Sequence, residues 1–168
     1  MSAPSIPLSF TQRRLWFLSR AEPGATYNIP IALRVRGDLD VAALRAALGD
    51  VVARHEVLRT AYPEVDGEPC QDIRPAAPVD LPVAVVQADG LAPALADAAR
   101  HVFDLTAAPP VLARLFRVDG DDAVLLVLLH HIAGDGWSMA PLARDVAEAY
   151  EARVGGGRRE LELEIGAG

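Results

Sequence analysis

The chain has 168 residues, of which 51% are hydrophobic, and this length and apolar content suffice for one compact domain with a buried core. The formal net charge is −7, and the arginines are scattered among aspartates and glutamates, which excludes the basic stripe of a nucleic-acid-binding protein. Because the single cysteine, Cys70, has no disulfide partner, and because we find neither a signal peptide nor an apolar run of about 18 residues, we expect a cytoplasmic protein outside the membrane.

A helix followed by a strand is expected at the start of the chain. Ser9 and Gln12 have the spacing of a capping box, which predicts a helix over residues 10–20. Residues 28–37 then alternate with a period of two, which predicts a strand. One face of this strand is apolar and consists of Ile29, Ile31, Leu33 and Val35.

A second helix and a hairpin follow. Asp40 is suited to cap a helix whose apolar side chains form one stripe, and this helix should end near His55. Two short strands are expected over residues 58–65 and 70–74. They flank the Asp-Gly pair at residues 66–67, which is typical of a tight hairpin turn.

The rest of the chain predicts a strand, a helix, two strands and a final helix. Residues 81–87 indicate a strand, and residues 91–103 indicate a helix with one apolar side. Two apolar strands follow over residues 110–118 and 123–131, joined by a short turn rich in Asp and Gly. The final helix carries an apolar stripe as far as Tyr150.

These elements predict an α/β (α+β) fold in which an open mixed β-sheet is covered by helices. Residues 123–129 are apolar at every position, which is typical of a central strand buried on both faces. We find no internal repeat, and from its length and apolar content the chain, residues 1–168, is expected to form one unit or one lobe of something larger. Its tail, residues 155–168, has an uncertain structure, although the alternation within residues 160–168 indicates an exposed edge strand.

Candidate chemical residues gather at the end of the central strand, in the sequence HHIAGDGWS at residues 130–138. His130 and His131 are consecutive, so they should point to opposite sides, one into a cleft and the other into the fold. The turn at Asp135 and Gly136 leads into the final helix, whose first backbone N–H groups form a small positive site. A histidine beside free N–H donors is a layout used in acyl transfer, where one group handles a proton and another stabilises an oxyanion.

Other interpretations of this segment remain open from the pattern alone. A histidine at a strand end is often a hydrogen-bonded core residue without a chemical role. A metal site of His130, His131 and Asp135 is less favoured, because adjacent strand residues diverge and no further ligand lies nearby. Asp135 could also pin the local backbone by pairing with an arginine.

Three separated segments carry a resemblance to one known family. They are LSFTQRRLWFL at residues 8–18, RHEVLRTAYPEVDG at residues 54–67, and HHIAGDGWS. They resemble the first motif, the RHExLRT segment and the HHxxxDG motif of the condensation domains of nonribosomal peptide synthetases, which are relatives of chloramphenicol acetyltransferase. The resemblance covers residues 8–153 and implies the N-terminal, donor-side lobe of a chloramphenicol acetyltransferase-like fold.

The resemblance implies an amide-forming reaction. The amine of an acceptor aminoacyl thioester would attack a donor acyl or peptidyl thioester. Both would be presented on the 4′-phosphopantetheine arms of carrier proteins, with no cofactor or metal bound by the chain itself. His131 would be catalytic, either as a general base or by positioning and stabilising the charged intermediate, and Gly136 would leave its N–H free to approach the thioester.

The resemblance also implies residues that support the site. His130 would be mainly structural. Asp135 would pair with an arginine of the RHEVLRT segment, for which Arg59 is the first candidate and Arg54 the second.

The family has two lobes, and this affects the expected activity. Because the active site lies between the lobes, one lobe alone would leave His131 open to water, so we predict that the isolated chain folds but does not condense substrates. The expected partners are a C-terminal lobe and the donor and acceptor carrier proteins, and the apolar face meant for the other lobe could form a dimer. The alternatives are a non-catalytic module that binds carrier proteins and a fragment of a CoA-dependent acyltransferase.

Overall fold

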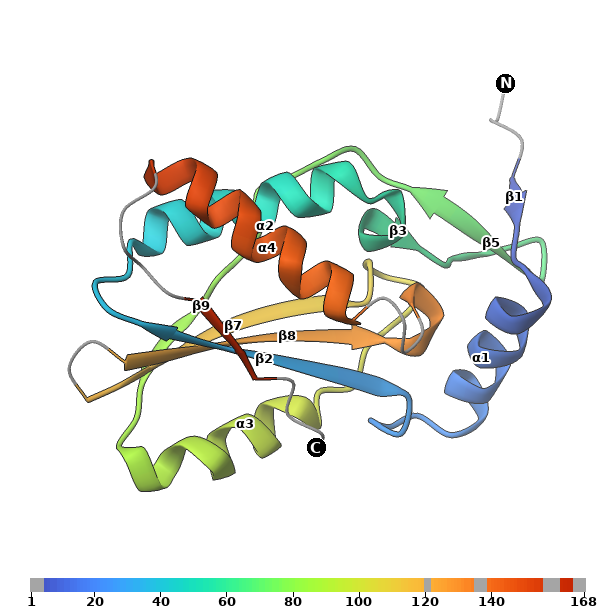
Figure 1. Ribbon diagram of the computed structural model, residues 1–168. Helices are drawn as coiled ribbons and strands as arrows, with labels where there is room; N and C mark the ends of the chain where they lie inside the picture. The colour runs from blue at the N-terminus through green and yellow to red at the C-terminus, as the bar shows by residue number, and fades with distance from the viewer. Residues whose placement is uncertain (1–4, 120–121, 135–138, 156–160, 165–168) are drawn as a thin grey trace.

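A computed structural model describes residues 5–119, 122–134, 139–155 and 161–164 of the chain. A five-stranded sheet with the strand order β6-β7-β8-β2-β9 forms its centre (Figure 1). The strands are β2 (Asn28–Arg36), β6 (Val83–Val85), β7 (Val111–Val118), β8 (Asp122–His130) and β9 (Leu161–Glu164).

The main sheet is mixed, as predicted. β8 is antiparallel to both β2 and β7, whereas β6 runs parallel to β7 along one edge. β9 pairs antiparallel with β2 along the other edge, in the part of the tail where the sequence indicated an edge strand. Helices cover both faces, which confirms the predicted α/β class.

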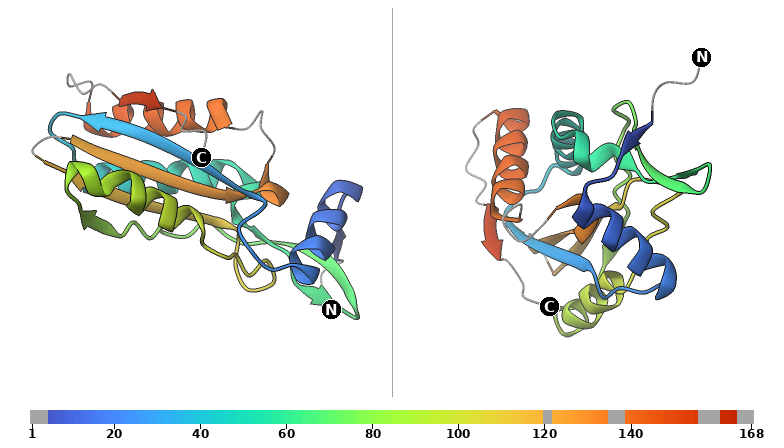
Figure 2. Two further views of the ribbon diagram at one scale, coloured as in Figure 1. Left: turned by 90° about the horizontal axis from the view of Figure 1, so that it is seen from below. Right: turned by 90° about the vertical axis from the view of Figure 1, so that its right-hand side faces the viewer.

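Two helices cover one face of the main sheet and one helix covers the other. α2 (Val41–Arg54) and α4 (Met139–Val154) pack side by side on one face, and α3 (Leu91–Ala99) lies on the opposite face (Figures 1 and 2). α1 (Phe10–Ala21) lies beyond the end of the sheet where β8 finishes. None of the helices in the described ranges is both long and apolar enough to cross a membrane.

The central strand provides much of the core. Every residue of β8 from Ala123 to His130 is buried, as the continuous apolar run predicted. Leu125, Val127 and Leu129 join the cluster under α2 and α4, whereas Leu126 joins the cluster under α3. Full burial of one such side chain stabilises the fold by about 1.5–3 kcal/mol.

Local caps place α1 and α2 where the sequence predicted them. The Ser9 hydroxyl accepts a hydrogen bond from the Gln12 N–H at 3.2 Å, and the Gln12 side chain accepts one from the Ser9 N–H at 2.9 Å. Asp40 caps α2 by accepting from the Ala43 N–H at 3.0 Å. His55 follows the last residue of α2.

The predicted hairpin forms a sheet of its own. β4 (Glu64–Val65) and β5 (Glu68–Ile73) flank Asp66 and Gly67, whose φ angles are +52° and +81°. Positive φ at both central residues is the requirement of a tight type I′ turn, which the Asp-Gly pair satisfies.

Two further short strands complete this smaller sheet. β1 (Ile6–Pro7), which the sequence did not predict, and β3 (Thr60–Ala61) pair with β5. The strand expected from residue 58 begins only at Thr60, because Glu56–Arg59 form the 3-10 turn η1. The Thr60 hydroxyl holds this turn by donating to the Glu56 carbonyl at 2.7 Å.

The helix predicted over residues 91–103 is shorter than expected. α3 ends at Ala99, and Val102, which was placed on its apolar side, is 52% exposed. The side-chain amide of Asn28 donates to the carbonyls of Ala99 and His101 at 3.0 and 2.6 Å. A side chain from β2 therefore occupies carbonyls at the end of the helix, and the chain turns away.

Candidate active site

The two histidines of the HHIAGDGWS segment lie on opposite sides of the chain. β8 ends at His130, and the chain turns at once into the short 3-10 helix η3 (His131–Ala133). His130 is 3% exposed, whereas the side chain of His131 is exposed. The backbone N–H of His131 donates to the Tyr27 carbonyl at 2.8 Å, which ties the turn to the start of β2. His131 is therefore presented at the surface by a turn that is anchored in the sheet.

His130 holds the same turn from inside. Its Nδ1 accepts a hydrogen bond from the Ile132 N–H at 3.0 Å, so a neutral ring carries its proton on Nε2. Burial, with a smaller contribution from His131, lowers the pKa of His130 to about 4. The ring is thus neutral near pH 7 and accepts a backbone bond that its doubly protonated form cannot accept.

The buried His130 should make the stability of the chain depend on pH. As the pH falls below the ordinary histidine pKa of 6.5, the unfolded chain binds the proton while folded His130, with its pKa of about 4, does not. The contribution of His130 is complete above about pH 6.5 and is lost between there and pH 4, an expected loss of about 3 kcal/mol. The free energies of unfolding by urea at pH 7.0 and 4.5 measure this loss.

A variant separates this effect from the titration of carboxylates. His130→Asn should remove most of the pH dependence between pH 6.5 and 4.5. Asp122, whose pKa is lowered chiefly by its hydrogen bond with Arg34, starts from an ordinary value of 3.8, so its contribution is lost at lower pH. An unchanged slope in His130→Asn would contradict the assignment.

A small aromatic cluster supports η3 from the side of α1. The indole Nε1 of Trp16 donates to the Tyr62 carbonyl at 2.8 Å, and the Tyr62 hydroxyl lies 3.4 Å from the Ile132 carbonyl, to which it donates. Burial raises the pKa of Tyr62 to about 12, so its hydroxyl stays protonated as a donor. Trp16, Tyr62, Leu105 and Ile132 pack together as one buried cluster. Local sequence patterns could not predict this support, because its members are far apart in the chain.

The arginines of the RHEVLRT segment differ in their surroundings. Arg54 is exposed at the end of α2. Arg59 is half-buried, and its Nη1 donates to the Arg74 carbonyl at 2.8 Å. Its Nε is buried without a hydrogen-bond partner among the described residues. Asp135 and Gly136 lie outside those residues, so their predicted roles stay predictions.

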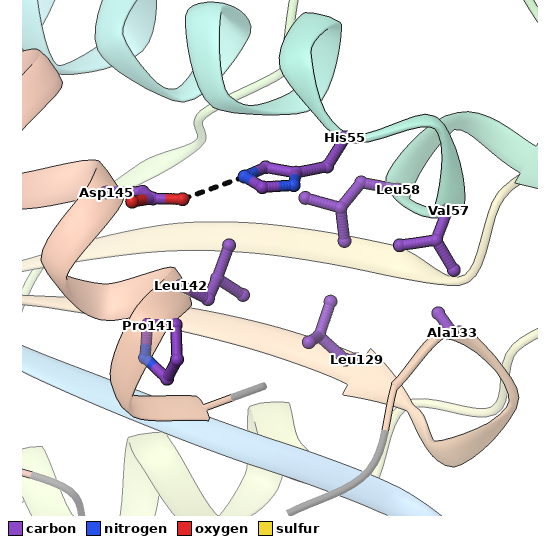
Figure 3. A pocket seen from close by; sticks show the side chains of 8 residues that line it. All are labelled: His55, Val57, Leu58, Leu129, Ala133, Pro141, Leu142 and Asp145. Atoms are coloured by element: carbon purple, nitrogen blue, oxygen red, sulfur yellow. Dashed lines mark hydrogen bonds and ion pairs between the residues drawn. The ribbon is translucent and has the colours of Figure 1, made fainter. Parts of the chain in front are cut away.

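The histidine of the same segment makes a contact that the sequence did not predict. Nε2 of His55 lies 2.8 Å from Oδ2 of Asp145, which joins the end of α2 to α4 (Figure 3). Between this pair and η3 lies a cavity of about 110 Å³. His55 stands inside the quoted motif, but its partner is 90 residues away. Sequence spacing could not reveal such a pair.

The described residues contain no group of three His, Cys, Asp or Glu side chains that could hold a metal ion. Of the three ligands considered from the sequence, His130 is buried and His131 is exposed on the other side, while Asp135 is outside the described ranges. The arrangement around η3 instead offers an exposed imidazole on a firmly held turn. Such a group is suited to accept a proton or to hold a charged intermediate.

Known proteins resemble the chain over most of its length. The family model described as Condensation domain matches residues 2–163. The dimodular nonribosomal peptide synthase of Bacillus subtilis is 52% identical over 154 residues, and the isonitrile lipopeptide synthase of Mycobacterium tuberculosis is 50% identical over 158 residues. Each match covers 90% of the chain but only 6% of the synthase.

Solved structures share its fold. An X-domain from teicoplanin biosynthesis is 43% identical with a TM-score of 0.85, and the match covers 93% of the chain and 34% of the X-domain chain. The starter condensation domain of the rhizomide synthetase RzmA is 26% identical with a TM-score of 0.82, and the match covers 92% of the chain and 39% of that domain. A further structure holds the X-domain in a complex with OxyB. The chain thus spans well under half the length of these relatives.

Proposed function

The chain belongs to the condensation-domain family, and from this membership we propose that it forms the donor-side part of a domain that joins two carrier-bound thioesters through an amide bond. The observation that carries the proposal is the exposed His131 on a turn that is fixed by buried His130 and by the Tyr27 carbonyl. The motif residues that remain outside the described ranges, Asp135 and Gly136, take their proposed roles from the family pattern.

The proposed reaction is a transfer of an acyl group from sulfur to nitrogen. The amine nitrogen of the acceptor attacks the carbonyl carbon of the donor thioester, a C–N bond forms, and the C–S bond breaks. The amine loses a proton and the departing phosphopantetheine thiolate gains one, so no cofactor is consumed. His131 either takes up this proton or holds the charged tetrahedral intermediate, and the Gly136 N–H is proposed to approach the thioester.

The proposed partners follow from the chemistry and from the length of the chain. A C-terminal lobe would close the water-exposed side of His131, and donor and acceptor carrier proteins would bring the phosphopantetheine thioesters. A dimer formed through the same face is the alternative when that lobe is missing. The single cysteine cannot form a disulfide within the chain, which favours the reducing cytoplasm as the compartment of the protein.

The test is a condensation assay with both carrier proteins loaded. The chain extended by a C-terminal lobe should form the amide product on the acceptor carrier, detected by intact-protein mass spectrometry. The 168-residue chain alone should form none, because its reaction side is open to water. Turnover by the chain alone would contradict the need for a second lobe, and no product from the extended protein would contradict the proposed reaction.

We propose in addition that Arg59 pairs with Asp135. The buried Nε of Arg59 has no partner among the described residues, and a carboxylate would satisfy it through a charge-assisted bond. A double-mutant cycle with Arg59→Ala and Asp135→Ala should give a coupling free energy of about 1–3 kcal/mol in urea unfolding. The matched cycle with the exposed Arg54→Ala should give less than about 0.5 kcal/mol. A larger coupling free energy for Arg54 than for Arg59 would identify Arg54 as the partner of Asp135.

One observation favours a second function. An X-domain that is 40% identical to the chain has been solved in a complex with OxyB, so a related domain binds another protein. A non-catalytic module would show no turnover even with His131 intact. The His131→Ala variant of such a module would still bind carrier proteins. A CoA-dependent acyltransferase would instead transfer an acyl group from soluble CoA thioester, which the same assay without donor carrier protein detects.

A further inference from the structure

A cavity of about 110 Å³ lies between α4, η1 and η3 (Figure 3). The side chains that form its walls are apolar: Val57, Leu58, Leu129, Ala133, Pro141 and Leu142. The cavity has a way in, because Val57 is 39% exposed and Pro141 is also exposed. Its floor is closed, because Leu129 is 1% and Ala133 is 4% exposed.

The polar groups of the cavity are already paired with each other. His55 and Asp145 line one side, and the 2.8 Å bond between them spans from the end of α2 to α4 (Figure 3). Among the described residues, the remaining walls offer no charged or hydrogen-bonding side chain to a ligand. A polar group that entered against these apolar walls would lose its water without gaining a partner from them, so this part of the cavity favours an uncharged aliphatic group.

The volume limits the size of this group. An apolar cavity of about 150 Å³ accommodates benzene. A cavity of 110 Å³ is smaller, and it is better matched to a branched aliphatic group of about four or five carbons than to an aromatic ring or a long acyl chain.

The cavity adjoins the segment that carries His131. Leu129 is the last residue before the histidine pair, and Ala133 is the last residue of η3. Both line the cavity, so the turn that presents His131 also forms one of its walls. A substrate held at His131 by its thioester would lie on the segment whose Leu129 and Ala133 line this cavity.

We propose that this aliphatic cavity receives the branched aliphatic group of a thioester substrate and thereby selects that substrate. The inference rests on the proposed function for the thioester, but the selection by size stands on the cavity itself. The group is either the side chain of an aminoacyl thioester or the end of a short acyl thioester, since both present the same chemistry.

Binding to the chain tests the cavity without any turnover. The probes are N-acetylcysteamine thioesters that carry acetyl, 3-methylbutanoyl, leucyl or benzoyl groups. The 3-methylbutanoyl or leucyl probe should bind at least about 10-fold more tightly than the acetyl probe, and the benzoyl probe should lose that advantage. Methyl-group NMR should show the largest shifts at Leu129 and Leu142. Tight binding of the leucyl probe alone would identify an amino-acid side chain as the occupant. Tight binding of the 3-methylbutanoyl probe alone would identify an acyl group.

A pair of variants provides the control. Val57→Phe places a ring at the mouth of the cavity and should abolish the preference for branched probes. Val83→Phe introduces the same ring at a valine of similar exposure, 43%, on the far edge of the main sheet, and should leave the preference unchanged. Equal binding of all four probes, or an unchanged preference in Val57→Phe, would overturn the proposal.

Condensation by the extended domain is scored separately, so the two proposals can fail independently. Selective probe binding without condensation would support selection by the cavity and overturn the proposed reaction. Condensation without selective probe binding would support the proposed reaction and overturn the proposal that the cavity selects the substrate.

Discussion

Alanine in place of His131 is expected to lower the rate of amide formation by the extended domain at least about 100-fold, because a positioned acid–base group typically contributes 10²–10⁴. The fold should be retained, since the imidazole is exposed and the hydrogen bond to the Tyr27 carbonyl comes from the backbone N–H, which alanine keeps. The free energy of unfolding should change by no more than about 0.5 kcal/mol. The product on the acceptor carrier and urea unfolding measure the two effects.

A histidine elsewhere on the surface gives the matched control. His101 is exposed in the segment after α3, and its ring meets Phe103 edge to face at a centroid distance of 4.9 Å. Its hydrogen bonds with Ala98 and Asn28 are made by its backbone N–H and carbonyl, which alanine keeps. His101→Ala should therefore retain both the rate and the stability. Full activity of His131→Ala with both loaded carriers would exclude a catalytic role for His131, and a loss of stability as large as the loss of rate would point to a structural role.

Alanine in place of Trp16 is expected to destabilise the chain by about 3–5 kcal/mol, the range for large aromatic side chains removed from a core. Trp16 is 2% exposed, and its Nε1 satisfies the Tyr62 carbonyl at 2.8 Å, so the substitution removes both packing and a buried hydrogen bond. Because Tyr62 in turn contacts Ile132 of η3, the turn that carries His131 should loosen as well. Urea unfolding measures the first effect, and hydrogen exchange at the Ile132 amide measures the second.

The neighbouring Phe17 separates this role from a general effect of removing a ring from α1. Phe17 is 46% exposed, and its ring meets Trp16 edge to face at a centroid distance of 5.0 Å. Phe17→Ala should cost no more than about 1.5 kcal/mol, the value of one such aromatic pair, and should leave exchange at Ile132 unchanged. Equal losses in the two variants would show that the cluster under η3 does not depend on Trp16.

The sequence by itself determined the elements whose signals are local. The capping box at Ser9, the cap at Asp40 and the Asp-Gly turn at residues 66–67 act within a few residues, so they could be recognised without knowledge of the fold. The period-two face of β2 and the apolar run of β8 also predicted which strands would lie in the core, because burial follows directly from these patterns. The strand predicted to reach His131 ends at His130, and His131 is exposed because the chain turns there into η3 and not because of strand alternation.

Only the tertiary structure decided where long-range contacts overrule local preference and where a cavity forms. α3 ends at Ala99, whose carbonyl accepts a hydrogen bond from Asn28, 71 residues away. Trp16 bonds Tyr62 over a separation of 46 residues, Tyr62 bonds Ile132 of η3 over 70, and His55 meets Asp145 over 90. Side-chain contacts of this kind depend on how the elements pack against each other, and neither periodicity nor motif spacing contains that information.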